Sequence, residues 1–257
     1  MNKNWYKILN MHGLLGITFF WAGDLLSDAL WEPLSAWSWM LVPLAVLLFL
    51  AWRSRTAFRL QPARPRGKAL FMIGLANYIT LCRGLLVCGL GGFASFSQLQ
   101  GFLAWVPAII YAIASAADAL DGLIARARKE ASPAGEVLDR EVDALGTFVA
   151  GMLCYQYGRL PAFYLAVGAA YYIFNLAIWL RMKHGKPVHP LQPKRFRRGV
   201  GVLQAFSLTL LLAPLLDPAQ GFLVAVALTL IVSASFLRDW MVVVGANWRV
   251  RWLPFRR

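Results

Sequence analysis

Charged residues are scarce in this chain, and acidic residues are the scarcest. The 257 residues include 12 Asp and Glu against 26 Lys and Arg, and charged residues make up only 15% of the total. A soluble domain has about 25% charged residues and roughly half apolar ones. Here the hydrophobic share is 59% and the formal net charge is +14. This composition excludes an ordinary soluble domain and indicates an integral membrane protein.

Cysteine and histidine are also few, with three of each. Cys82, Cys88 and Cys154 stand in apolar runs, without the spacing of a metal site or a disulfide framework. We therefore interpret all three as small buried residues. The opening "MNKNWYKILNMHG" runs into an apolar segment without a small-residue cleavage site, so we expect no cleavable signal peptide.

Long apolar runs, in contrast, are abundant. A run of roughly 20 residues crosses a hydrocarbon core of about 30 Å. Such runs lie near residues 11–31, 35–52, 71–93, 102–124, 142–158, 161–180, 200–216 and 220–244. The first is the least regular, because three acidic residues crowd its far end. We expect an all-α, polytopic transmembrane helical bundle of six to eight spans, with six core spans and about two N-terminal extra spans.

The Lys and Arg residues gather in alternate connections, which predicts the orientation. With a cytoplasmic N-terminus, the basic stretches at 53–68, 126–140 and 181–198 and the C-terminal "NWRVRWLPFRR" are all cytoplasmic, and Arg159 is the basic residue left outside. We expect an integral membrane protein, taken to lie in a bacterial inner membrane, with both termini cytoplasmic. The basic loops suit anionic membrane lipids. They are too divided to form a nucleic-acid surface, so no nucleic acid is expected as a partner.

The stretch "DALDGLIARARKEASPAGEVLDREVD", residues 118–143, holds seven of the twelve acidic residues. On a helix, Asp118 and Asp121 share one face, and Asp139 and Asp143 share another. Between the pairs, "SPAG" predicts a turn that lets the two faces meet on the cytoplasmic side. Four converging carboxylates need divalent cations, and hard oxygen ligands favour magnesium, manganese or calcium over zinc.

Small residues accompany these aspartates. Gly122 stands in mid-helix, where glycine costs about 1 kcal/mol relative to alanine, which suggests that something approaches this backbone closely. The preceding "AIASAADAL" is rich in small residues. Such a segment is equally typical of tight helix packing and of room for a ligand.

The spacing of eight residues in this stretch resembles, without a departure, the signature of the CDP-alcohol phosphatidyltransferases; the eight are Asp118, Asp121, Gly122, Ala125, Arg126, Gly135, Asp139 and Asp143. Upstream, "ANYITLCR" is similar to that family's Pro-Asn, two residues, Thr, two residues, Arg, with Ala76 in place of the proline. The resemblance covers about residues 70–245. We therefore expect a six-span catalytic domain over 70–257 and an N-terminal extension over 1–69 with one or two spans and a basic linker.

The resemblance implies a phosphotransferase of phospholipid biosynthesis. Such enzymes use two divalent cations, Mg²⁺ or Mn²⁺, to hold the pyrophosphate of a CDP-linked donor, usually CDP-diacylglycerol. A small polar alcohol attacks the lipid-side phosphorus and CMP leaves. By family resemblance, we also expect a homodimer.

The resemblance also implies roles for particular residues. Asp118, Asp121 and Asp139 would be metal ligands, and Asp143 would be the general base and would also touch a metal. The CDP site would be lined by Gly122, Ala125, Arg126 and Gly135, with Asn77, Thr80 and Arg83 from the preceding helix.

A basic loop before the seventh apolar run is the candidate binding site for the acceptor alcohol. Its "PKRFRRGVGVLQ" loosely resembles a segment of phosphatidylglycerophosphate synthases. Lys194, Arg195, Arg197 and Arg198 would then bind a phosphorylated acceptor such as glycerol 3-phosphate. The same residues equally fit a plain cytoplasmic-loop signal.

Two other functions are compatible with the sequence. The first is transfer of a phosphoalcohol from CDP-choline or CDP-ethanolamine to diacylglycerol. The second is a membrane transporter, which also buries carboxylates among helices. A transporter would not need Gly122, Arg126 and Gly135 at these spacings.

Overall fold

Helices make up the fold of the computed structural model, which describes residues 35–59, 75–96, 99–127, 133–191 and 195–245. No strand occurs in these ranges, which confirms the predicted all-α helical bundle. The expected first span, 11–31, lies outside the described residues. The α-helices are α2 Ser35–Arg59, α3 Leu75–Gly92, α4 Val106–Ala127, α5 Pro133–Gln156, α6 Tyr164–Gly168, α7 Ala170–Lys183, α8 Arg195–Leu212 and α9 Pro218–Val244.

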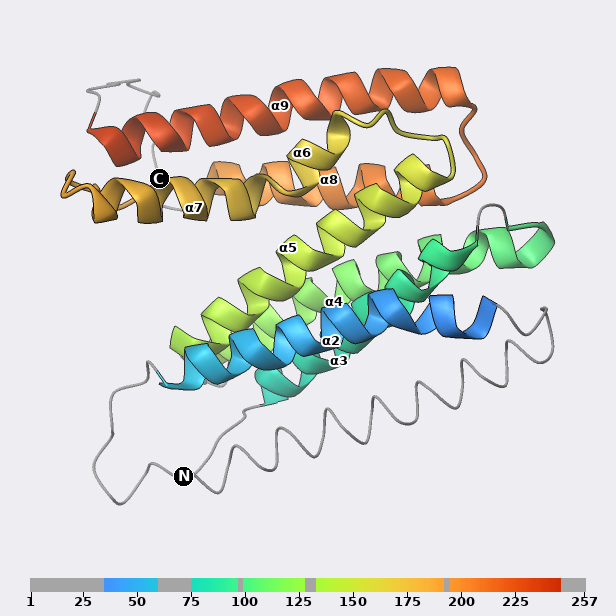
Figure 1. The fold of residues 1–257 in the computed structure, drawn as a ribbon, viewed down its shortest axis with the longest axis horizontal. Helices are drawn as coiled ribbons and strands as arrows, with labels where there is room; N and C mark the ends of the chain where they lie inside the picture. The colour runs from blue at the N-terminus through green and yellow to red at the C-terminus, as the bar shows by residue number, and fades with distance from the viewer. Residues whose placement is uncertain (1–34, 60–74, 97–98, 128–132, 192–194, 246–257) are drawn as a thin grey trace.

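Helix α5 is the centre of the arrangement. It runs diagonally between a group formed by α2, α3 and α4 and a layer formed by α6 to α9 (Figure 1). It packs against α2, α3, α4, α6 and α8. Leu153 and Cys154 in its second half have no exposed surface. The position of α5 is therefore fixed by contacts with helices on several sides.

Three of the described segments are long and apolar enough to cross a membrane by themselves, namely Tyr78–Ser95, Gly101–Leu120 and Pro218–Val244. Helices α5 and α8 carry more charge, all of it in their first three turns. The exact number of spans stays a prediction.

The run at 161–180, expected as one span, is divided into α6 and α7. Ala169 lies between them with φ −84° and ψ −2°. A Cβ atom added at Gly168 would lie 3.4 Å from the Cα atom of Phe148 in α5, so the backbones approach closely at this point. The bend allows α6 to pack on α5 while α7 packs on α9.

Helix boundaries follow ordinary capping chemistry where the structure describes them. The backbone N–H of Gln220 donates to Oδ1 of Asp217 at 2.8 Å, and the N–H of Asp217 donates back to Oε1 of Gln220 at 3.2 Å. This capping box, with Pro218 next to it, starts α9. Pro133, from the predicted "SPAG" turn, is the first residue of α5.

The expectation of buried cysteines is right for Cys88 and Cys154 and wrong for Cys82, which is exposed. Cys82 stands next to the buried Arg83 on α3, so it points in another direction around the helix. An apolar sequence run does not distinguish a core-facing position from an outward-facing one.

Candidate functional site

Three of the four predicted aspartates meet at one place. Asp118 comes from α4, and Asp139 and Asp143 come from α5. One carboxylate oxygen from each lies within 4.8 Å of the others. The prediction that the two acidic helix faces meet is thus confirmed for these three residues. Asp121 belongs to α4, and its side chain lies outside the described part of the structure.

Arg83 of α3 joins the three carboxylates. Its Nη1 atom lies 3.1 Å from Oδ1 of Asp118 and 2.7 Å from Oδ1 of Asp139, and Nη2 donates to Asp143. Its Nε donates to the carbonyl oxygen of Ala114 at 3.1 Å, so α4 also orients the guanidinium. The Arg83 side chain is only 3% exposed. Arg83 therefore ties α3, α4 and α5 together at the candidate site.

The three aspartates are far more open than the arginine that holds them. Their side chains are 44% (Asp118), 35% (Asp139) and 48% (Asp143) exposed. Among the contacts named above, three carboxylates face one guanidinium. Exposed carboxylate oxygens gathered in this way suit a hard divalent cation such as Mg²⁺ or Mn²⁺. The donor set therefore fits the metal that the sequence predicts.

The other residues expected at the CDP site lie on the same three helices. Thr80 is buried one turn before Arg83, and Gly135 is buried in the first turn of α5. Gly122 is partly buried in α4. Asn77 of α3 and Ala125 and Arg126 of α4 have described backbones, whereas their side chains lie outside the described residues.

The four residues expected to bind the acceptor lie around the start of α8. Lys194 precedes the described range, and Arg195 is the first residue of α8. Arg198 is exposed. Arg197 donates from Nη1 to Oδ2 of Asp239 in α9 at 3.2 Å. Part of this basic group therefore also connects α8 to α9.

Sequence reasoning missed a second charged contact on α5. Glu141 has a side chain only 1% exposed, pairs with Nη2 of Arg53 in α2, and accepts a 3.1 Å hydrogen bond from the hydroxyl of Tyr171. The signal was present, because Glu141 occupies a helix face whose neighbours Leu138 and Val142 are apolar. An acidic residue on such a face requires a cationic partner from another helix.

A comparison with protein families gives one match for this chain. The CDP-alcohol phosphatidyltransferase family model matches residues 73–246. The matched range contains α3 to α9 and every aspartate of the candidate site, and α2 precedes it. Comparison with curated proteins and with solved structures gives no match. The predicted domain division between residues 69 and 70 stays a prediction.

Proposed function

Because the chain belongs to the CDP-alcohol phosphatidyltransferase family, whose members are membrane phosphotransferases acting on CDP-alcohols, we propose that it moves a phosphatidyl group from CDP-diacylglycerol to a polar alcohol and releases CMP. The observation that carries this proposal is the convergence of Asp118, Asp139 and Asp143 on Arg83. The reaction belongs to phospholipid biosynthesis.

Asp118, Asp121, Asp139 and Asp143 hold two divalent cations, Mg²⁺ or Mn²⁺, in this proposal. Bound cations of this kind neutralise the charge that spreads over phosphoryl oxygens during transfer. The exposed fractions of the three described carboxylates support the assignment, because a diphosphate can reach them. Arg83 keeps the carboxylates close together despite their mutual repulsion.

Asp143 acts as the general base. Its carboxylate takes the proton of the acceptor hydroxyl, and that oxygen forms a bond to the lipid-side phosphorus. The bond from this phosphorus to the bridging oxygen breaks, and CMP leaves with the electron pair. The side chain of Asp143 is 48% exposed, which supports this role, since a base must be within reach of the acceptor.

The CDP portion lies against α3, α4 and the start of α5. Gly122, Ala125, Arg126 and Gly135 line it, and the glycines let the nucleotide approach the backbone. Asn77, Thr80 and Arg83 contribute hydrogen bonds and charge from α3. The short connection between α4 and α5, which brings Gly122 and Gly135 to the same end of the bundle, supports this placement.

Lys194, Arg195, Arg197 and Arg198 bind a phosphate group of the acceptor, such as that of glycerol 3-phosphate. The Arg197–Asp239 contact supports the site indirectly, because it holds the start of α8 against α9. We also propose that the enzyme lies in a bacterial inner membrane as a homodimer, with the site and both termini on the cytoplasmic side.

The test is CMP release by the purified protein with CDP-diacylglycerol and Mg²⁺ or Mn²⁺. The acceptor panel contains glycerol 3-phosphate, inositol phosphate, serine, glycerol and choline. We expect CMP with one acceptor of the panel and the matching phospholipid as product. CMP release only from CDP-choline or CDP-ethanolamine with diacylglycerol would replace the donor assignment. Solute flux in vesicles without CMP release from any donor would instead indicate a transporter.

A further inference from the structure

Helix α2 precedes the family match and yet contacts α5, which carries Asp139 and Asp143, and α3, which carries Arg83. It packs on both α3 and α5. Near its end, Arg53 forms the ion pair with Glu141 of α5. Glu141 lies between Asp139 and Asp143 in the sequence. The N-terminal extension thus reaches the turn of α5 on which the candidate site depends.

Two arginines hold this turn of α5 from opposite sides. Residues two apart on an α-helix point about 200° away from each other. Asp139 and Asp143 face Arg83, and Glu141 faces Arg53 on the other side of the helix. Because the Arg53 and Arg83 contacts lie on opposite faces, a rotation of α5 about its axis would displace both of them.

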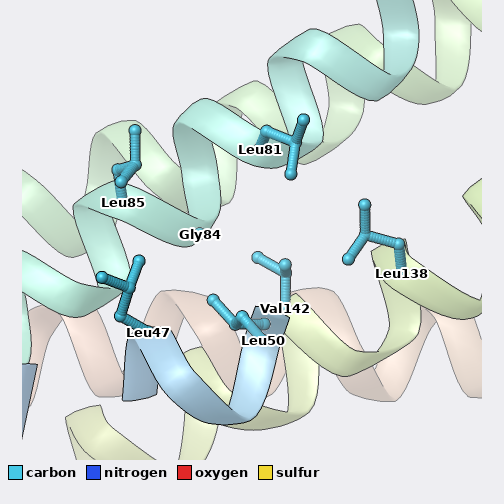
Figure 2. Close-up of a pocket in the computed structure, with 7 residues that line it drawn as sticks. All are labelled: Leu47, Leu50, Leu81, Gly84, Leu85, Leu138 and Val142. Carbon is cyan, nitrogen blue, oxygen red and sulfur yellow. The ribbon is translucent and has the colours of Figure 1, made fainter. Parts of the chain in front are cut away.

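Helices α2 and α3 pack closely at Gly84, which is next to Arg83. A Cβ atom at Gly84 would lie 3.1 Å from Cδ1 of Leu50, and one at Gly91 would lie 3.1 Å from Cγ1 of Val42. The pairings place α2 antiparallel to α3. Figure 2 shows Leu50 and Val142 close to Gly84. Leu50 and Arg53 are one turn apart on α2, so the same face of α2 contacts the neighbours of Arg83 and Asp143.

The Arg53–Glu141 pair leaves polar atoms without hydrogen bonds. Among the described residues, Oε2 of Glu141 and Nε of Arg53 are buried and have no hydrogen-bond partner. The side chain of Glu141 is 1% exposed and that of Arg53 is 31% exposed. An ion pair with a buried, incompletely hydrogen-bonded carboxylate is poor as a source of stability, and an apolar pair of similar size often serves better. One use that such pairs do have is to fix the register of packed helices.

We propose that α2 is a positioning element of the active centre, in which Arg53 holds Glu141 and thereby fixes the rotation of α5 that aims Asp139 and Asp143 at the metals. Arg53 and Glu141 are positioning residues, because they act through the aspartates. The inference rests on the proposed function, in which those aspartates bind divalent cations.

The experiment measures Mn²⁺ binding to the purified full chain, together with CMP release and metal-free thermal unfolding. The variants are Arg53→Gln, Glu141→Gln and the combination of both. Arg140→Gln is the matched control, because Arg140 is next to Glu141 on α5 but forms an exposed pair with Glu136 in the same helix. Changes to residues that orient metal ligands typically weaken metal binding about 10- to 100-fold.

We expect the combined variant to unfold near the wild-type temperature, since it leaves no unpaired buried charge, and to bind Mn²⁺ about 10- to 100-fold more weakly. A further variant, Arg53→Lys, keeps the positive charge and should lose less Mn²⁺ affinity than Arg53→Gln. Arg140→Gln should bind Mn²⁺ as the wild type does. If Arg53→Gln alone does not fold, the combined variant decides. Wild-type Mn²⁺ affinity in the combined variant would overturn the proposal and leave the pair a purely structural contact.

Failure of the proposed function gives a different result. Wild-type protein that binds Mn²⁺ but releases no CMP from any CDP donor would contradict the reaction and leave the positioning of the metal ligands to be decided by the Mn²⁺ affinities. Wild-type protein without Mn²⁺ affinity would overturn both.

Discussion

Nη1 of Arg83 lies 2.7 Å from Oδ1 of Asp139, across 56 residues of sequence and between two different helices. The same atom is 3.1 Å from Asp118. One buried cation therefore sets the spacing of carboxylates that would otherwise repel each other.

Asp118→Asn, Asp121→Asn and Asp139→Asn each remove a charged ligand and keep the shape of the side chain. We expect CMP release to fall by orders of magnitude while folding is largely retained, because metal-assisted transfer depends on these charges. Glu136→Gln is the control, since Glu136 is an exposed carboxylate on α5 that pairs with Arg140. Near-normal rates in any of the three aspartate variants would remove that residue from the metal site.

Chelation of divalent cations should abolish turnover. Adding Mg²⁺ or Mn²⁺ back should restore CMP release, because these ions suit the oxygen ligands of the cluster. Thermal unfolding gives an independent reading, since an ion that binds the folded protein raises the midpoint. Full activity after exhaustive chelation would contradict the proposed cofactors.

Arg83→Met should destabilise the metal-free protein. Removing one partner of a buried ion pair costs about 3–5 kcal/mol, and the cost here should lie at or below the lower end because the aspartates are partly exposed to solvent. Mn²⁺ should then raise the unfolding midpoint of this variant more than that of the wild type, since the cation relieves the repulsion. An equal rise in both proteins would argue that Arg83 does not balance the metal-binding carboxylates.

Lys194→Gln combined with Arg198→Gln tests the acceptor site. We expect the acceptor KM to rise about ten- to a hundredfold per residue and the KM for the CDP donor to stay nearly unchanged, because each lost charge-assisted hydrogen bond is worth roughly 1.5–3 kcal/mol. Arg197 is left intact, since its contact with Asp239 would confuse binding with stability.

Lys183→Gln is the control for the acceptor site, because Lys183 is an exposed basic residue at the end of α7. The effect of the paired substitution should also disappear with glycerol, which has no phosphate. Equal shifts in both KM values would show that these basic residues do not bind the acceptor and serve only as the Lys and Arg bias of a cytoplasmic loop.

The convergence of Asp118 with Asp139 and Asp143 was predictable, because helical spacing fixes which residues share a face and a short connection forces the two helices to be neighbours. The approach of Arg83 was only partly predictable. Its motif placed it near the nucleotide, whereas its orientation depends on how α3 packs against α4 and α5. Periodicity within one helix contains no information about that packing.

The Arg53–Glu141 contact and the bend at Ala169 were not predicted at all. Both depend on pairs of segments far apart in the sequence. Glu141 belongs to an acidic stretch, and its apolar helix face indicates a cationic partner without indicating which helix supplies it. The segment at 161–180 is largely apolar, and nothing in its composition reveals that Gly168 must pass close to Phe148.

The positions of Asp139 and Asp143 along α5 determine how deep in the membrane the proposed reaction takes place. At a rise of 1.5 Å per residue, Asp139 and Asp143 lie about 9 and 15 Å along the axis from Pro133. The headgroup layer on each side of a bilayer is roughly 5–8 Å thick. If Pro133 lies at the water surface and α5 runs along the membrane normal, both aspartates lie beyond this layer, in the outer part of the hydrocarbon region. The lipid donor can then react with its acyl chains still in the hydrocarbon. The water-soluble alcohol and the departing CMP are the molecules that must cross the headgroup layer.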